Sequence, residues 1–76
     1  MVYAYTLIDA ATGLAEDVRQ TVSEVEGVAD AHVIAGDFDV IVELESDDPH
    51  GLLTIVTADI RPVEGVGTTR TYVCLD

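Results

Sequence analysis

The residues best suited to chemistry lie in the stretch AGDFDVIVEL, residues 35–44. It opens with Gly36, Asp37 and Asp39 and continues as an alternating apolar strand. A carboxylate here can pair with an ammonium group, and a glycine-containing turn leaves backbone N–H groups open to a carboxylate. These groups together could form the floor of a binding site. The same residues also suit a plain hairpin turn, because Gly and Asp both tolerate turn conformations.

A second polar pair, Thr69 and Thr71, lies two positions apart in an apolar, β-branched segment near the C-terminus. Side chains at alternate positions of a strand point to the same face. The two hydroxyls can therefore complete the hydrogen bonding of a ligand. Threonine is also simply a favourable strand residue, so the structural interpretation stays open.

No catalytic or metal-binding pattern accompanies these groups. His32 and His50 lack the spacing of a metal-binding pair, and Cys74, the only cysteine, has no evident histidine partner. The segment EGVGTT, residues 64–69, has no phosphate-loop lysine and leads into a strand rather than a helix. We therefore expect no enzyme, no metal and no cofactor.

The charge balance is strongly acidic, with fifteen Asp and Glu against three arginines, no lysine, and a formal net charge of −12. Because 49% of the residues are hydrophobic, the chain can still bury a core. An acidic, lysine-free surface predicts a halophilic protein, since the Debye length falls to about 3 Å at 1 M salt. A basic partner is the alternative. Nucleic acid needs a basic patch, so we expect no direct contact with it.

The 76 residues predict one domain over 1–76. No charge-poor run approaches the ~20 residues that span a membrane. The start, MVYAYTLIDA, lacks the features of a signal peptide and reads as a strand. We expect a cytoplasmic protein and a complete short gene product.

Hydrophobic periodicity predicts strands at 2–9, 29–35, 38–45 and from 65 onward, the middle two joined by a two-residue Gly36-Asp37 turn. A first helix is predicted between the strands at 2–9 and 29–35, with Thr12 as N-cap and Gly27 at C′. A second begins at Pro49 after a cap at Asp47 or Asp48 and stops at Pro62. The tetrapeptide VEGV occurs at both helix-to-strand transitions, 25–28 and 63–66. The predicted buried helix residues are Leu14, Val18, Val22 and Val25, then Leu52, Leu53, Val56 and Ile60.

This β-α-β-β-α-β order predicts an α+β, ferredoxin-like fold, in which a four-stranded antiparallel sheet carries two helices on one face. The other face would be too apolar for a small monomer in water. A second copy packing sheet to sheet would cover it, giving an isologous dimer. The residues predicted for this dimer interface are Tyr3, Tyr5, Leu7, Val33 and Ile41.

The hairpin Gly36-Asp37-Phe38-Asp39 and the later GVGTTRT, residues 65–71, occur in the order and spacing typical of one family. With the element order, the chain resembles the effector-binding and assembly domain of the Lrp/AsnC ("feast/famine") transcription regulators, also called the RAM domain. The resemblance implies sheet-to-sheet dimers, further joined into tetramers or octamers, with an amino-acid effector between dimers. By position, the hairpin residues 36–39 would form the floor of that pocket, and Thr69 and Thr71 its opposite wall.

Full members of that family carry a helix-turn-helix domain before this module, whereas here Met1 leads directly into the first strand. The chain therefore resembles stand-alone versions of the domain. Such a module would not bind an operator itself, but could co-assemble with full-length regulators through a matching sheet face.

Two other classes share the expected fold. Small dimeric α+β-barrel enzymes, monooxygenases or isomerases, place an active site in a cavity within each subunit. Arg70, Tyr72 and His32 are the only residues here that could serve it. An ACT-like regulatory domain of a metabolic enzyme would also bind a small molecule, with a different dimer geometry.

Overall fold

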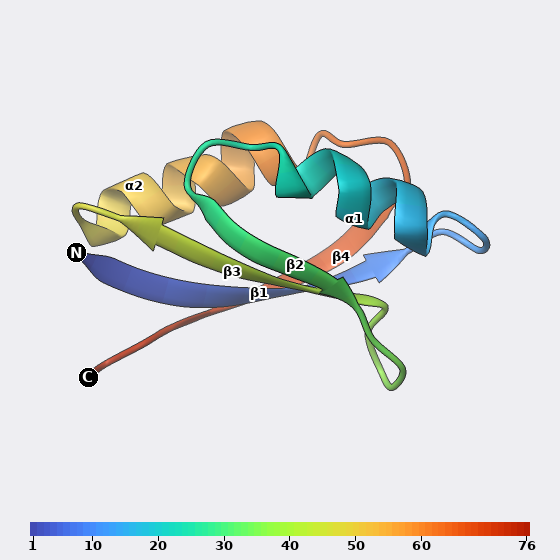
Figure 1. Cartoon of the computed structure of the whole chain (residues 1–76), viewed down its shortest axis with the longest axis horizontal. Coiled ribbons are helices and arrows are strands. Elements are labelled where there is room, and N and C mark those ends of the chain that lie inside the picture. Colours follow the sequence, from blue (N-terminus) through green and yellow to red (C-terminus); the bar gives the residue numbers. More distant parts are fainter.

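The computed structural model describes all residues, 1–76, and confirms the β-α-β-β-α-β order (Figure 1). The strands form one antiparallel sheet in the order β2-β3-β1-β4, and both helices cover the same face of it (Figure 1). The elements are β1 (Val2–Ala10), α1 (Ala15–Ser23), β2 (Val28–Val33), β3 (Val40–Ser46), α2 (Pro49–Thr54) with its π-helical continuation η1 (Ile55–Ile60), and β4 (Val66–Val73).

The core lies between the sheet and the helices, because alternate residues of the two central strands point toward α1 and α2. Ala4, Thr6 and Ile8 of β1 are fully buried, and β1 pairs in register with the equally buried apolar positions of β3. A slip of one residue would expose this whole set, so the hydrophobic pattern fixes the register. The fully buried apolar residues are Ala4, Ile8, Val18, Val22, Val40, Val42, Leu44, Leu52 and Ile60.

The second helix begins as predicted. Asp48 is its N-cap and accepts a hydrogen bond of 2.7 Å from the Gly51 N–H, and Pro49 occupies the first helical position. Beyond Thr54 the helix widens into η1, where the Arg61 N–H donates to the Val56 carbonyl, five residues back. The prediction that Leu53 is buried was wrong, because it lies on the solvent side and is 55% exposed.

The first helix begins later than predicted. Residues 11–14 form a turn closed by the Leu14 N–H donating to the Ala11 carbonyl, and α1 starts only at Ala15. Thr12 is therefore not its N-cap, which is Leu14 without a side-chain bond.

The two VEGV segments adopt the same turn before β2 and β4. Gly27 and Gly65 have φ values of +95° and +94°, which favour glycine, and the Val28 and Val66 N–H groups each donate three residues back at 3.1 Å. Gly27 is not the C′ residue of α1, because that helix has already ended at Ser23. A Cβ on Gly27 would collide with Ile55, so this turn also needs glycine for packing.

The β2–β3 hairpin is longer than predicted. The strands end at Val33 and restart at Val40, which leaves a six-residue loop, 34–39, in place of a two-residue turn. The Ile34 N–H donates to the Asp39 carbonyl, and the Asp39 N–H donates sideways to the Ile8 carbonyl of β1 at 2.9 Å. These bonds bend the loop away from the strand direction, and it projects from the sheet on the side opposite the helices (Figure 1).

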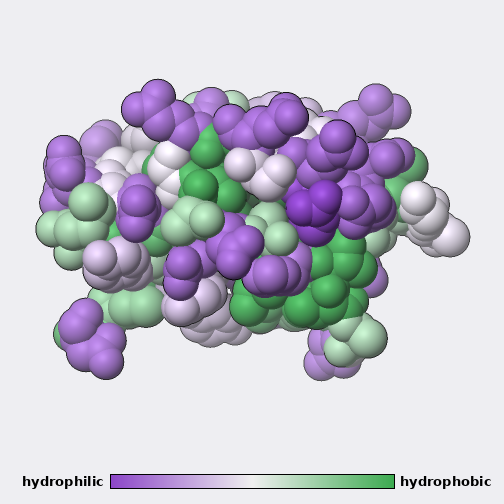
Figure 2. Space-filling view, viewed as in Figure 1, coloured by the Kyte–Doolittle hydropathy of each residue, from purple (hydrophilic) through white to green (hydrophobic).

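No helix of the structure has both the length and the apolar character needed to cross a membrane. Hydrophilic side chains are spread over the helix layer rather than collected in one patch (Figure 2).

Candidate functional site

The carboxylate of Asp39 is bound to the backbone. Its Oδ2 accepts a 2.8 Å hydrogen bond from the Ala10 N–H, at the point where the pairing of β1 with β4 shifts between Ile8 and Ala10. This bond satisfies an amide that the irregular ladder would otherwise leave without a partner. The sequence left open whether Asp39 has a structural role or binds a ligand. In the single chain its role is structural, because it accepts a backbone hydrogen bond. Its second oxygen takes part in no hydrogen bond within the chain.

Phe38 joins the hairpin to the last strand. The guanidinium carbon of Arg70, on β4, lies 5.9 Å from the centre of the Phe38 ring, which is within cation–π range. Asp37 and Gly36 lie exposed at the tip, and the Asp37 carboxylate has no partner in the chain. The loop therefore presents the free carboxylate of Asp37, and its Phe38 ring lies beside the guanidinium of Arg70. Sequence spacing gave no signal for the Phe38–Arg70 contact, because 32 positions separate the two residues.

Thr69 and Thr71 do point to the same face, but it is the helix-bearing face. They pair with Ile8 and Thr6, whose side chains are buried beneath the helices, and the Thr71 hydroxyl lies 2.9 Å from that of Thr6. The hairpin projects toward the opposite face (Figure 1). Within one chain the two sets flank the same end of β1 but do not line one pocket.

The open face of the sheet carries an aromatic and aliphatic surface. Tyr3 and Tyr5 are 43% and 40% exposed, Leu7 and Ile41 are half-buried, and Tyr72, paired with Tyr5, is 57% exposed. Tyr72 was not among the predicted interface residues, because only the β1–β4 register shows that it lies beside Tyr5.

Val33 does not belong to this open face. It pairs with Val40, whose side chain is in the core, so Val33 lies on the helix-bearing side at the edge of the sheet and is 46% exposed. The prediction that Val33 belongs to the dimer interface was made without the β2–β3 register, in which the pairing shifts between Val28 and Asp30.

Polar groups border the open face over β2 and β3. The Tyr5 hydroxyl donates a 2.9 Å hydrogen bond to Glu43, and this bond, with the charge of Glu43, raises the pKa of Tyr5. His32 Nε2 lies 3.0 Å from an oxygen of Asp30. These four residues and Ile41 line a shallow hollow of about 140 Å³.

Arg70, Tyr72 and His32 all lie on strands at the open face, and none lines a cavity beneath the helices.

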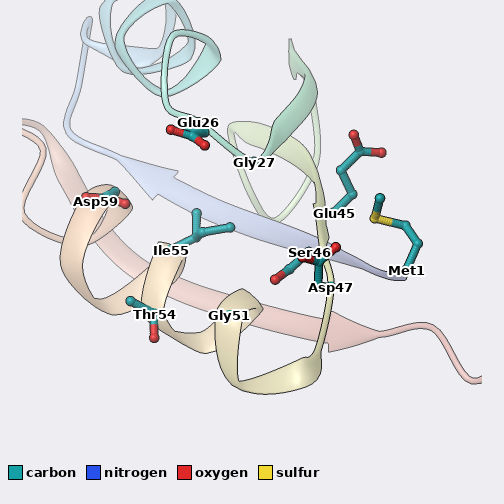
Figure 3. A pocket seen from close by; sticks show the side chains of 10 residues that line it. All are labelled: Met1, Glu26, Gly27, Glu45, Ser46, Asp47, Gly51, Thr54, Ile55 and Asp59. Atoms are coloured by element: carbon teal, nitrogen blue, oxygen red, sulfur yellow. The ribbon is translucent and has the colours of Figure 1, made fainter.

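The largest hollow, about 520 Å³, lies at the other end of the sheet, between the first VEGV turn and α2 (Figure 3). The sequence did not indicate it, because its lining comes from four separate segments. In Figure 3 Ile55 projects from the second helix toward Gly27, with acidic side chains around it. Its charged side chains are all acidic, and no group of three or more acidic, histidine or cysteine side chains in the chain has the geometry to hold a metal ion. The carboxylates are Glu26, Glu45, Asp47 and Asp59.

Comparison with known proteins adds a family. The model of the Lrp/AsnC ligand binding domain matches residues 3–76. An uncharacterised HTH-type transcriptional regulator of Pyrococcus abyssi is 32% identical over 76 residues, which cover 96% of this chain and 51% of that protein. The chain therefore spans about half the length of this relative. A homocitrate synthase of Sulfurisphaera tokodaii is 38% identical over 58 residues, covering 76% of this chain and 12% of the enzyme.

Solved structures agree on the fold. The structure of FFRP-DM1 superposes with a TM-score of 0.91 at 29% identity, covering 99% of this chain and 100% of that one. The complex of the transcriptional regulator NMB0573 of Neisseria meningitidis with L-Met superposes with a TM-score of 0.86 at 16% identity, covering 99% of this chain and 50% of that one. The second likeness shows a shared fold only.

Proposed function

Because the chain belongs to the Lrp/AsnC ligand binding domain family, we propose that this regulatory module assembles through its open sheet face and binds a free amino acid at the hairpin, without touching DNA itself. The observation that carries the proposal is the hairpin, which offers an unpartnered Asp37 carboxylate and holds the Arg70 guanidinium against Phe38 at the same end of the sheet. A zwitterion needs one partner of each charge.

The assembly part rests on the open face. Three exposed tyrosines and two half-buried aliphatic residues form an apolar surface that a second copy would remove from water. A homodimer is the smallest such assembly. The opposite orientation of the hairpin and of Thr69 and Thr71 supports pockets built from more than one chain, and so tetramers or octamers.

The amino-acid part rests on charge and on the family. Asp39 already holds the Ala10 amide, so Asp37 is the carboxylate free for an ammonium group. The regulator NMB0573 was solved with L-Met on the same fold. The three arginines, Arg19, Arg61 and Arg70, lie on separate elements and offer DNA no basic patch. In the cytoplasm the module would act by co-assembling with longer regulators that carry a matching domain.

Thermal unfolding in concentrated salt with each common amino acid tests ligand binding. A ligand that binds only the folded state raises the midpoint temperature of unfolding. At a free concentration of a hundred times Kd it adds about 2.7 kcal/mol to the free energy of unfolding. We expect a rise with one or two amino acids, abolished by Asp37→Asn. The matched control is Asp47→Asn, which removes the same charge from the acidic hollow and should leave the rise intact. No rise with any amino acid at millimolar concentration would contradict effector binding.

A second candidate follows from the homocitrate synthase, which contains a segment 38% identical to most of this chain. The same module could regulate a metabolic enzyme, as an ACT-like domain does. Affinity purification from native extract separates the two: recovery of a helix-turn-helix regulator supports the first, and recovery of a biosynthetic enzyme supports the second.

A further inference from the structure

The carboxylate of Asp9 lies at the hairpin end of the sheet and has no partner in the chain. It is exposed and takes part in no hydrogen bond or ion pair. Side chains alternate along β1, and Thr6 and Ile8 are buried beneath the helices. Asp9 therefore belongs to the open face of the sheet, the side toward which the hairpin projects (Figure 1).

Two hydrogen bonds from the hairpin hold β1 on either side of Asp9. The Asp39 N–H donates to the Ile8 carbonyl at 2.9 Å, and the Asp39 carboxylate accepts from the Ala10 N–H at 2.8 Å. Asp9 lies between these two bonded residues of β1. The backbone position of Asp9 is therefore set by the same contacts that place the hairpin.

The last strand bulges opposite Asp9. The pairing of β1 with β4 shifts between Ile8 and Ala10, so that positions 67 and 68 of β4 both face the single residue Asp9. A Cβ on Gly67 would lie 3.0 Å from the Asp9 carbonyl oxygen and 3.8 Å from its Oδ2, so glycine allows β4 to approach closely here. Bulges often redirect a side chain beside a binding site, and here the bulge lies against a carboxylate without a partner.

Arg70 of β4 lies on the same face as Asp9. It pairs with Leu7, two positions before Asp9, which makes Arg70 and Asp9 diagonal neighbours. Such neighbours lie about 7–8 Å apart, within reach of long side chains. A neutral amino acid would need only Arg70 for its carboxylate and Asp37 for its ammonium group. Asp9 then remains available for a third charge.

We infer that Asp9 binds a positive charge on the side chain of the ligand, so that the hairpin site takes a basic amino acid such as lysine or arginine. This inference rests on the amino-acid binding proposed above and specifies the class of ligand. An acidic side chain in the same place would meet the Asp9 carboxylate and be repelled. The net charge of −12 adds to that repulsion at longer range. A neutral side chain would gain no ion pair from Asp9.

Matched ligands test the side-chain charge by itself. Citrulline has nearly the shape of arginine without its charge, and norleucine is lysine without the terminal ammonium group. Calorimetric titration, at the lowest salt concentration that keeps the protein folded, should give Kd values about tenfold lower for arginine and lysine than for citrulline and norleucine. Asp9→Asn, which keeps the shape of the side chain, should abolish this preference and leave citrulline binding unchanged. The control Asp47→Asn should retain the preference.

The outcomes distinguish this inference from the proposed function. Neutral amino acids that bind as tightly as their charged counterparts would overturn the role of Asp9 and leave amino-acid binding intact. A preference for arginine and lysine that survives Asp9→Asn would overturn it as well. If no amino acid binds, both the inference and the proposed function fail. The ratio of Kd values for the unaltered protein decides the case if Asp9→Asn does not fold.

Discussion

The hydroxyl oxygens of Thr6 and Thr71 lie 2.9 Å apart on the helix-bearing face of the sheet, and Thr6 is fully buried. Thr71→Val would leave the buried Thr6 hydroxyl without this partner and lower the free energy of unfolding by about 1–3 kcal/mol. Thr6→Val should cost less, because Thr71 is only partly buried and can turn to water. The double variant should recover part of the loss, and urea unfolding of all four proteins measures it. Strictly additive costs would show that the two hydroxyls do not interact.

Gly27 and Gly13 allow packing and backbone strain to be separated. Both have positive φ, +95° and +80°, so an alanine at either position costs about 1–2 kcal/mol of backbone strain. Only at Gly27 would the added Cβ also collide with Ile55, whereas Gly13 faces open space. Gly27→Ala should therefore lower the unfolding free energy by about 1–3 kcal/mol more than Gly13→Ala. Equal losses in chemical denaturation would mean that Ile55 moves aside at no cost.

Stability should depend on alkaline pH through Tyr5. Its hydrogen bond to Glu43 raises its pKa in the folded state above the ordinary value near ~10. The bond therefore stabilises fully below that ordinary pKa and is lost as pH rises through the raised one. When the tyrosine ring signals are titrated by NMR, the midpoint pH of Tyr5 should lie above the ordinary tyrosine value. Glu43→Gln should lower that midpoint pH. A midpoint unchanged by Glu43→Gln would exclude this cause.

The two hairpin carboxylates should differ in their effect on folding. Asp39→Ala removes the acceptor of the Ala10 N–H and should cost about 1–3 kcal/mol of unfolding free energy. Asp37→Ala removes a carboxylate of equal charge that has no partner in the chain, so it should be close to neutral. Thermal unfolding without any amino acid compares them. A similar loss for both variants would argue that the charge of the loop, rather than the Ala10 bond, governs its stability.

A net charge of −12 predicts that salt stabilises the fold. The melting temperature should rise between low salt and ~1 M KCl, where the Debye length is about 3 Å. The rise should shrink at acid pH, because protonated carboxylates no longer repel one another and leave less repulsion for salt to screen. This comparison separates the screening of charge repulsion from general salting-out. A melting temperature independent of KCl at neutral pH would remove the argument for a halophilic protein.

Element order and the core could be read from the sequence because they depend on local periodicity. The position of Asp48 and Pro49 before the second helix is likewise a local signal. The length of the hairpin loop was not predictable, because the bond from Asp39 to Ile8 joins residues 31 positions apart. The face on which Val33 lies was not predictable for a similar reason, because the shift in the β2–β3 pairing becomes visible only when the two strands are aligned. The candidate site residues were proposed from a motif, and that Phe38 and Thr71 point to opposite faces became evident only from the register of β4.

The bond from the Ala10 amide to Asp39 has a consequence for recognition. With Oδ2 engaged, the rotation of this carboxylate is restricted before any molecule arrives, and its free oxygen keeps one direction. Ordering a flexible side chain on binding typically costs about 0.5–1.5 kcal/mol, and folding has already met that cost here. In the proposed site, beside the free carboxylate of Asp37, the second oxygen of Asp39 would accept a hydrogen bond only from a donor that lies in this fixed direction. A donor in any other direction would first have to break the amide bond, so the fixed orientation of Asp39 would restrict which ligands fit the hairpin.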